Sequence, residues 1–357
     1  MKELFSAGVD VTKKCTLRCL HCFNFSGDEK ATTCDEELTD KELITMATSI
    51  LECNPKSMCM CGGEPLLRKD AIMEIANIAR DKYPNSSINM VSNGQLITAQ
   101  VAEDLWKVGF KNIQISLDGA SPETVDWIRN KEGMYEAATS ALRYLSESRK
   151  RLGIDTDICI SFCPTKKNLP ELEKAIDFCE SLDINSFRVQ PLMLLGRAKE
   201  FLGEYVLSKA EYHDLARRLK NRNSINARSG ERLETKWGDP MDHLLIEDVD
   251  ELRFIQVNAY GDVLFTPYIP IAFGNIRNRS LKEYTEFDWN KVWNHELYKY
   301  VRSLMVTPEH MDLSEIAALP SIGYGQVRFD LLDPDWSNKM DDLLIQLQKE
   351  HAEVHGA

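Results

Sequence analysis

The chain has 357 residues, and its 43 lysines and arginines against 56 aspartates and glutamates give a formal net charge of −13. This acidic balance argues against a protein that binds duplex nucleic acid, because such binding needs cations that displace counterions. No apolar run reaches the roughly 18 residues of a membrane span, and the N-terminus lacks the apolar segment of a signal peptide. We therefore expect a cytoplasmic protein, with no membrane partner, whose ten cysteines carry free thiols.

Strands and helices are expected to alternate along the first 190 residues. The strands are short, rich in apolar or β-branched residues and bounded by turn residues. They are Leu4–Val11, Ser57–Cys61, Ser87–Val91, Asn112–Leu117, Thr156–Cys163 and Ser186–Gln190. The helices between them begin at Thr39 or Asp40 and then cover Ala71–Lys82, Ala99–Val108, Tyr135–Leu152 and Leu169–Leu182. Six strand–helix units in a row predict a parallel sheet.

The pattern changes after Gln190. Two apolar runs, Leu252–Ala259 and Val263–Tyr268, flank Gly261-Asp262 and predict a hairpin. The other expected elements are a loop at Leu195–Ala198, an exposed basic helix at Ala210–Lys220, an irregular junction at Ser224–Pro240, and helices near Leu281–Glu286, Trp289–Leu304 and Met340–His351. The length fits one large α/β domain and a smaller one.

Three cysteines follow the first expected strand in the sequence Cys15-Thr-Leu-Arg-Cys19-Leu-His-Cys22. Three thiolates at this spacing on one loop can bind three irons of a cubane cluster. The fourth iron is then left without a protein ligand and can chelate an amino and a carboxylate group. Zinc is the alternative, although zinc sites usually add a second pair of ligands further along the chain.

Small and polar residues follow the next three strands. Gly62, Gly63 and Glu64 come after the second strand, Asn93 after the third, and Ser116 closes the fourth. Glycines allow a close approach of the backbone to a ligand, and a carboxylate can accept from an ammonium group. Because ligands of parallel sheets bind at the C-terminal ends of strands, these residues predict one binding site.

These motifs taken in order, CTLRCLHC, GGEP, SNG, SLDG and GRA, resemble the radical S-adenosylmethionine (SAM) superfamily over roughly residues 5–200. The resemblance implies a partial (β/α)6 barrel, a single [4Fe-4S] cluster on Cys15, Cys19 and Cys22, and reductive cleavage of SAM to a 5′-deoxyadenosyl radical. It also implies an external electron donor of the flavodoxin or ferredoxin type. Its SAM contacts map onto Gly62, Gly63 and Glu64 for the amino group, Asn93 and Ser116 for the ribose or carboxylate, and Arg129 for the carboxylate. A surface position on a helix is the alternative for Arg129.

The fifth strand carries Cys159, Ser161 and Cys163 at alternate positions, so the three side chains share one face. If Ser161 faces the barrel interior near SAM, Cys163 is a candidate hydrogen-atom donor to a substrate radical. The alternative is that these cysteines are small buried hydrophobic residues. The same alternative applies to Cys34, Cys53, Cys59 and Cys179.

The C-terminal half resembles the accessory region of the SPASM/Twitch branch of the superfamily. The resemblance rests on the expected hairpin around Gly261-Asp262 and on Phe273-Gly274-Asn275-Ile276. No cysteine follows Cys179, and Tyr268 stands where a cluster cysteine is expected. Tyr268, at the expected domain junction, is a second, weaker hydrogen-donor candidate. We expect a barrel in residues 1–200, a connecting segment in 201–250, a smaller α+β accessory domain without a cluster in 251–305, and a partly helical tail in 306–357.

Three functions fit the sequence. The first is an enzyme that abstracts hydrogen from a peptide, for example in cross-linking or epimerisation; because only 14 residues precede Cys15, we expect no fused leader-binding domain. The second is an enzyme acting on a small molecule, such as a sugar, an amino acid or an antibiotic precursor. The third is a cluster-binding sensor or partner subunit without catalysis. The lack of C-terminal cysteines favours a redox-neutral reaction or an oxidation that uses the single cluster.

Overall fold

One mixed sheet organises the chain. The computed structural model describes residues 4–28, 36–238, 254–264, 266–267, 271–304 and 327–355. Seven strands run parallel in the order β1 to β7: Ser6–Thr12, Ser57–Gly62, Ser87–Ser92, Asn112–Ser116, Asp157–Phe162, Ser186–Val189 and Glu234–Trp237. On the other side of β1 the sheet continues through β8 (Phe254–Val257), β9 (Asp262–Leu264), β10 (Ile271–Asn275) and β11 (Val327–Arg328). The predicted α/β fold with a parallel sheet is confirmed.

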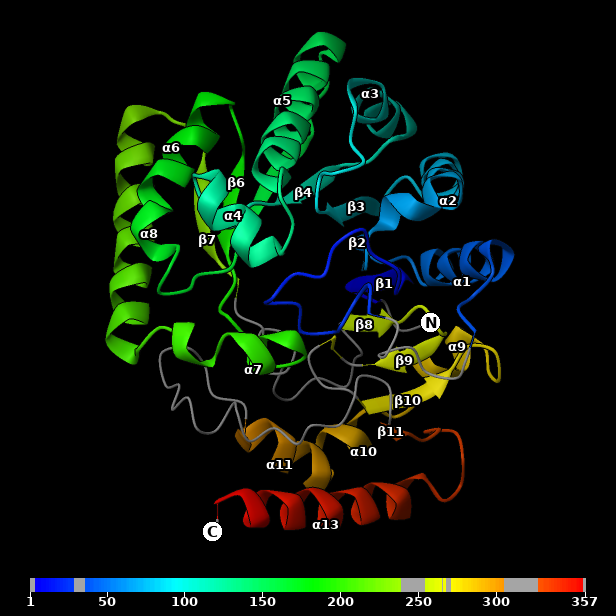
Figure 1. Ribbon diagram of the computed structural model, residues 1–357. Helices are drawn as coiled ribbons and strands as arrows, with labels where there is room; N and C mark the ends of the chain where they lie inside the picture. Colours follow the sequence, from blue (N-terminus) through cyan, green and yellow to red (C-terminus); the bar gives the residue numbers. More distant parts are fainter. Residues whose placement is uncertain are drawn as a thin grey trace.

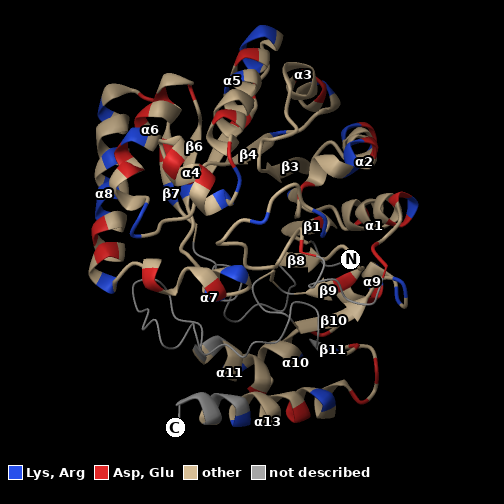
Figure 2. Cartoon of the chain, in the orientation of Figure 1, with Lys and Arg blue, Asp and Glu red and all other residues tan. Residues whose placement is uncertain are grey.

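Helices cover the outer face of the parallel strands (Figure 1). They are α1 (Asp40–Glu52), α2 (Lys69–Lys82), α3 (Ala99–Val108), α5 (Met134–Leu152), α6 (Leu172–Ser181) and α8 (Lys209–Ser229). The shorter α4 (Pro122–Arg129) and α7 (Arg197–Phe201) and the 3-10 turns η2 (Pro65–Arg68), η3 (Leu169–Glu171) and η4 (Gly203–Tyr205) complete this part. Charged residues of both signs lie on the outer helices, whereas the strands carry few (Figure 2). None of the described helices is both long and apolar enough to cross a bilayer.

Helix ends were largely predictable because local signals fix them. Thr39 caps α1 through a capping box with Glu42. Thr98 accepts from the backbone of Val101 at the start of α3, and Gly109 ends that helix in the left-handed conformation. The predicted start of the first helix and both ends of Ala99–Val108 are confirmed.

Alternation along the strands separates a core face from a cavity face. In β4, Ile113 and Ile115 are fully buried against the helices, whereas Asn112, Gln114 and Ser116 line a cavity. Residues from β1 to β6 and from β8 line this same cavity, so the sheet curves around it. Polar side chains of the strands therefore face the cavity, whereas the layer between the sheet and the helices is apolar.

The structure refines two expectations for residues 201–250. The helix α8 is longer than predicted and is not merely an exposed basic helix, because it buries Tyr212, Leu215 and Leu219. The supposed irregular junction contains β7, which pairs in parallel with β6 and so belongs to the barrel sheet. The parallel sheet thus extends to residue 237, whereas the domain limits stay a prediction.

The C-terminal strands join the barrel directly, because β8 pairs in parallel with β1. The predicted hairpin is present as antiparallel β8 and β9, with Gly261 at a φ of 86° in its turn. The helices that follow are α9 (Leu281–Thr285), α10 (Asn290–Trp293), α11 (Glu296–Leu304) and α13 (Trp336–His355). Tyr268 and Cys34 lie outside the described residues.

Candidate active site

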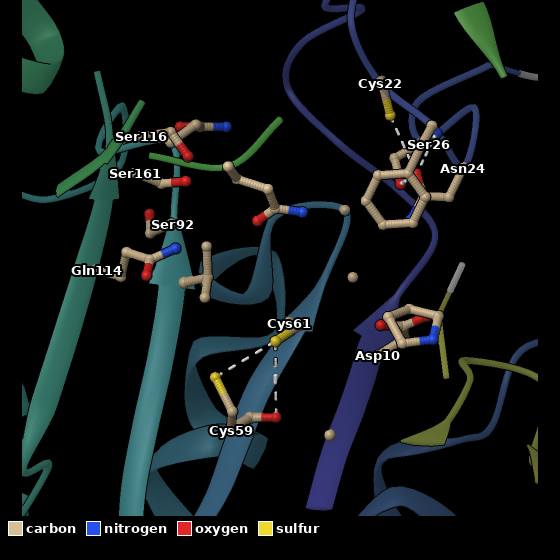
Figure 3. A pocket seen from close by; sticks show the side chains of 18 of the residues that line it. Asp10, Cys22, Asn24, Ser26, Cys59, Cys61, Ser92, Gln114, Ser116 and Ser161 are labelled. Carbon is tan, nitrogen blue, oxygen red and sulfur yellow. Dashed lines mark hydrogen bonds between the residues drawn. The ribbon is translucent and has the colours of Figure 1, made fainter. Parts of the chain in front are cut away.

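A cavity of about 520 Å³ lies inside the curve of the sheet. Cys15, Cys19 and Cys22 line it from the loop that follows β1, and Gly62 and Gly63 line it from the end of β2. Further lining residues, shown in part in Figure 3, include Ser92, Gln114, Ser116, Ser161 and Arg188. The cavity therefore brings together the cysteine loop and the strand ends that the sequence predicted to form one site.

The Gly196-Arg197-Ala198 motif, which follows β6, holds the cysteine loop in place. Arg197 donates from Nε to the carbonyl oxygen of Cys19 and from Nη2 to that of Ser26, both at 2.9 Å. Its backbone N–H donates to the carbonyl oxygen of Cys22 at 3.0 Å. Gly196 has a φ of 56°, and a Cβ there would come within 2.5 Å of the Cys22 carbonyl oxygen. Only glycine fits this close approach between the two segments.

Polar groups surround the thiols. Arg129 Nη1 lies 3.8 Å from Cys19 Sγ, and Asn93 Nδ2 lies 3.9 Å from Cys15 Sγ. Burial raises the pKa of the Cys15 thiol, and it raises the pKa of Cys19 to about 12. The thiols of Cys15 and Cys19 are thus protonated when no metal is bound, and iron would have to displace their protons.

The residues fit a [4Fe-4S] cluster better than a single metal ion. Among the described residues, no group of three histidine, cysteine or carboxylate side chains could hold one ion. A cubane distributes its cysteines over separate irons and so needs no such convergence. Two buried donor groups without a hydrogen-bond partner, Arg129 Nε and Arg197 Nη1, also suit an anionic group in this place. Burial lowers the pKa of His21 to about 4, so it is neutral.

The turn after β2 approaches the cysteine loop closely. Gly63 N–H donates to the carbonyl oxygen of Thr12 at 2.7 Å, and Glu64 N–H donates to that of Lys14 at 2.9 Å. A Cβ on Gly63 would overlap the Lys14 carbonyl oxygen, and one on Gly62 would lie 2.6 Å from the Thr12 carbonyl oxygen. The two glycines are therefore needed to position the loop, in addition to any contact with a ligand.

The side chain of Glu64 is buried behind the Gly62–Gly63 turn. It is 0% exposed and does not line the cavity. Its oxygens accept from Leu66 N–H at 3.2 Å, from Ser92 Oγ at 2.9 Å and from Asn93 N–H at 2.9 Å. The contact of this carboxylate with the ammonium group of SAM stays a prediction, and the structure adds that its oxygens are buried and accept hydrogen bonds inside the protein.

Arg129 is buried beside the cysteine loop, which excludes the alternative of a surface position on α4. It is 7% exposed and forms an ion pair with Asp118, which follows β4. Asp118 also accepts from the backbone N–H of Cys163 at 2.8 Å. The pair leaves Arg129 Nε without a hydrogen-bond partner. Arg129 stays a candidate partner of an anionic group, and Asp118 is the residue that orients it.

Three predicted residues on neighbouring strands lie on the cavity face. Ser116 on β4 is in register with Ser161 on β5, and Asn93 follows β3. All three line the cavity. Asn93 Nδ2 also donates to Thr16 Oγ1 at 3.1 Å, so this side chain joins β3 to the cysteine loop. The geometry agrees with a shared binding surface at these strand ends.

The side chains of β5 alternate between the two faces as predicted, but the two cysteines of the cavity side lie at different depths. Cys163 lines the cavity together with Ser161. Cys159 lies deeper, is 5% exposed, and contacts the side-chain oxygen of Gln114 at 3.7 Å. Cys163 therefore stays a candidate donor, whereas Tyr268 lies outside the described residues.

Sequence reasoning missed several residues of the cavity. Cys59 and Cys61 on β2 point into it, and so does Arg188 on β6. No hydrogen bond or ion pair joins the guanidinium of Arg188 to another residue in the described part of the chain. The two-residue period of strands could have placed these side chains on the cavity face, since Arg188 is in register with Ser161.

Residues 9–179 match the family described as the Radical SAM superfamily. The chain therefore carries a radical SAM domain, and the members of this superfamily are enzymes that use a [4Fe-4S] cluster and SAM. The predicted radical SAM domain, and with it the use of a [4Fe-4S] cluster and SAM, is thus confirmed, whereas the SPASM/Twitch branch and the single cluster stay predictions.

Two curated relatives place the chain within the superfamily. It is 28% identical over 191 residues to an AdoMet-dependent heme synthase of Methanosarcina barkeri, which is 54% of this chain and 51% of that protein. It is 26% identical over 246 residues to a probable GTP 3′,8-cyclase of Methanocaldococcus jannaschii, covering 68% of this chain and 78% of that protein. The chain spans about half the length of the first relatives that it matches.

Solved structures share the fold. Streptococcus suis SuiB bound to S-adenosylmethionine aligns with a TM-score of 0.64 at 15% identity, over 82% of this chain and 68% of that one. Native anSMEcpe with bound AdoMet and the Cp18Cys peptide aligns with a TM-score of 0.62 at 17% identity, over 98% of this chain and 96% of that one. At these identities the likeness is one of fold.

Proposed function

We propose that this protein cleaves SAM reductively to methionine and a 5′-deoxyadenosyl radical, which abstracts a hydrogen atom from a substrate in the cavity. One observation carries the proposal: Cys15, Cys19 and Cys22 open onto the same cavity as the Gly62–Gly63 turn. Cys15, Cys19 and Cys22 would hold a [4Fe-4S] cluster, which would supply the electron for the cleavage once an external donor of the flavodoxin or ferredoxin type had reduced it.

The residues of the chain have separate parts in this proposal. The Gly62–Gly63 turn receives the methionine end of SAM, because its backbone faces the cavity beside the cysteine loop. Ser116 and Ser161 offer hydroxyl groups to the ribose or carboxylate from adjacent strands. Arg129, oriented by Asp118, offers its free Nε–H to a carboxylate.

For the substrate we propose a peptide. The structural neighbour that spans nearly all of this chain, anSMEcpe, has a bound peptide, and SuiB is known with its precursor peptide. The cavity has the size of a pocket for a drug-sized ligand, for which about 300–1,000 Å³ is typical. What enters it together with SAM is then a single side chain or backbone segment rather than a large molecule.

A small molecule is the second candidate, and the sequence relatives favour it. The heme synthase and the GTP cyclase are named for small-molecule products or substrates. Arg188 supports an acidic group in either kind of substrate, because its guanidinium faces the cavity without an ion-pair partner among the described residues. A carboxylate or a phosphate matches a guanidinium in charge and geometry.

Anaerobic reconstitution with iron and sulfide, followed by dithionite and SAM, tests the proposed chemistry. Wild-type protein should form 5′-deoxyadenosine and methionine, and Cys19→Ala should form neither. Cys53→Ala is the matched control, since Cys53 is a buried cysteine outside the cavity. Wild-type protein with a full cluster and no deoxyadenosine would refute the proposal. Mass spectrometry with peptide and small-molecule candidates then separates the two substrate classes.

A further inference from the structure

Two thiols contact each other inside the cavity. Cys59 and Cys61 alternate with Met58 and Met60 along β2, and the methionines are buried in the apolar core. The cysteines therefore face the opposite side of the strand, which is the cavity side. Their sulfur atoms lie 3.4 Å apart (Figure 3).

These two cysteines differ from most of the others in their surroundings. Cys53 and Cys179 are buried within the apolar core, as is usual for free cysteine. Cys163 packs against a second, smaller apolar cluster. Cys59 and Cys61 are only half-buried and belong to neither cluster of the described residues. Packing therefore does not explain why two thiols occupy these positions.

The pair lies beside the proposed site of SAM. Cys61 directly precedes the Gly62–Gly63 turn and is in register with Asp10 on β1, the strand that leads into the cysteine loop. A carbon radical that forms in this cavity thus has a thiol on the wall around it. The contact with Cys59, together with burial, raises the pKa of Cys61, so its S–H bond is intact at neutral pH.

We propose that the Cys59–Cys61 pair donates a hydrogen atom to carbon radicals formed in this cavity; the inference rests on the proposed function. The S–H bond of Cys61 breaks, a C–H bond forms on the radical carbon, and a thiyl radical stays on Cys61. For the 5′-deoxyadenosyl radical and other unstabilised alkyl radicals the step is downhill, because an S–H bond is weaker than an aliphatic C–H bond.

The second thiol, Cys59, can move the radical away from Cys61. Cys59 can pass its own hydrogen atom to the Cys61 thiyl across the 3.4 Å contact, an exchange between like groups that moves the radical one step away from the product. One electron from the external low-potential donor and one proton from water then restore the thiol. The reaction class that uses such a donor replaces a substrate hydrogen without net oxidation of the substrate, as in epimerisation.

A test needs no knowledge of the substrate, because the deoxyadenosyl radical is itself a carbon radical. The full chain, with its cluster reconstituted, is supplied with SAM and dithionite in deuterium oxide, without added thiols or substrate. Cysteine S–H groups exchange to S–D in this solvent. Mass spectrometry should find one deuterium in the 5′-deoxyadenosine from wild type. Cys61→Ser should lose this label, because an O–H bond is too strong to donate, and Cys59→Ser should reduce it.

The controls separate this inference from the proposed function. Cys53→Ser, outside the cavity, should keep the label, and iron content with circular dichroism shows that each variant folds. Deoxyadenosine without deuterium in wild type, a label that persists in Cys61→Ser, or a label that disappears only in Cys163→Ser overturns the role of the pair. Wild-type protein that forms no deoxyadenosine would instead contradict the proposed function.

Discussion

The backbone N–H of Asn93 donates a 2.9 Å hydrogen bond to the carboxylate of Glu64. The two residues are separated by 29 positions and follow two neighbouring strands, β3 and β2. Ser92 Oγ donates to the same carboxylate at 2.9 Å. The buried carboxylate of Glu64 therefore links the turn after β2 to the end of β3, and its replacement should affect the stability of the fold.

Glu64→Gln should lower the free energy of unfolding by about 1–3 kcal/mol, because the amide nitrogen would face a backbone N–H that then loses its acceptor. Urea unfolding and SAM binding measure the two effects. Glu74→Gln, exposed on α2, is the control and should leave both unchanged. A Glu64→Gln protein that is as stable as wild type but does not bind SAM would support a direct contact between this carboxylate and SAM.

Gly63→Ala should prevent cluster binding, since a Cβ there overlaps the carbonyl oxygen of Lys14 next to Cys15. The expected result is a loss of most of the roughly four irons that a [4Fe-4S] cluster contributes. Gly203→Ala is the matched control, because a Cβ on Gly203 meets no atom within 4 Å. Equal iron content in the two variants would show that the loop tolerates a displacement of the turn.

Arg197→Lys should weaken the cysteine loop, because lysine cannot reproduce the two hydrogen bonds to the carbonyl oxygens of Cys19 and Ser26. We expect a loss of about 1.5–3 kcal/mol in the free energy of unfolding, and faster release of iron to a chelator. The exposed Arg217 gives the control Arg217→Lys. Unchanged iron release would assign the loop geometry to other contacts.

Asp118→Asn should destabilise the fold by about 3–5 kcal/mol, because it leaves Arg129 buried without its counterion. The double variant with Arg129→Met should recover part of this loss, since no unpaired charge is left. Chemical unfolding of the four proteins of this cycle gives the coupling energy. Additive effects of the two substitutions would contradict a direct ion pair.

Alanine at Cys15, Cys19 or Cys22 should each abolish cluster binding, whereas Cys53→Ala should keep it. Wild-type protein should hold about four irons and four sulfides per chain, because the sequence has no cysteine after Cys179. Iron and sulfide analysis with the charge-transfer absorption of the cluster measures this. About eight irons per chain would reveal a second cluster.

The expected limits of a helix agree with the structure where local chemistry sets them. Thr98 and Gly109 bound α3 through a cap and a left-handed glycine, and both signals are visible in the sequence. The same holds for the alternation in β5, which predicts that Ser161 and Cys163 share one face, and both residues line the cavity. The shared position of Cys15, Cys19 and Cys22 was likewise predictable, because all three lie on one loop.

The strand β7 could not be predicted from local sequence signals. Glu234–Trp237 has four residues and two charges, and nothing in it predicts a barrel strand. Its conformation follows from hydrogen bonds to β6 and from the cover of α8, both of which are contacts between distant segments. The domain boundary expected near residue 200 stays a prediction, although the barrel sheet extends past it to Trp237 for this reason.

The sequence by itself determined which residue types stand at each strand end, because strand period, glycine turns and cysteine spacing are local properties. Only the tertiary structure decided where those side chains point. It turned Glu64 inward toward Asn93, paired Arg129 with Asp118, and set Cys61 on the cavity wall. These outcomes depend on which strand end lies next to which, and a buried carboxylate or guanidinium takes whichever partner that arrangement brings within hydrogen-bond distance.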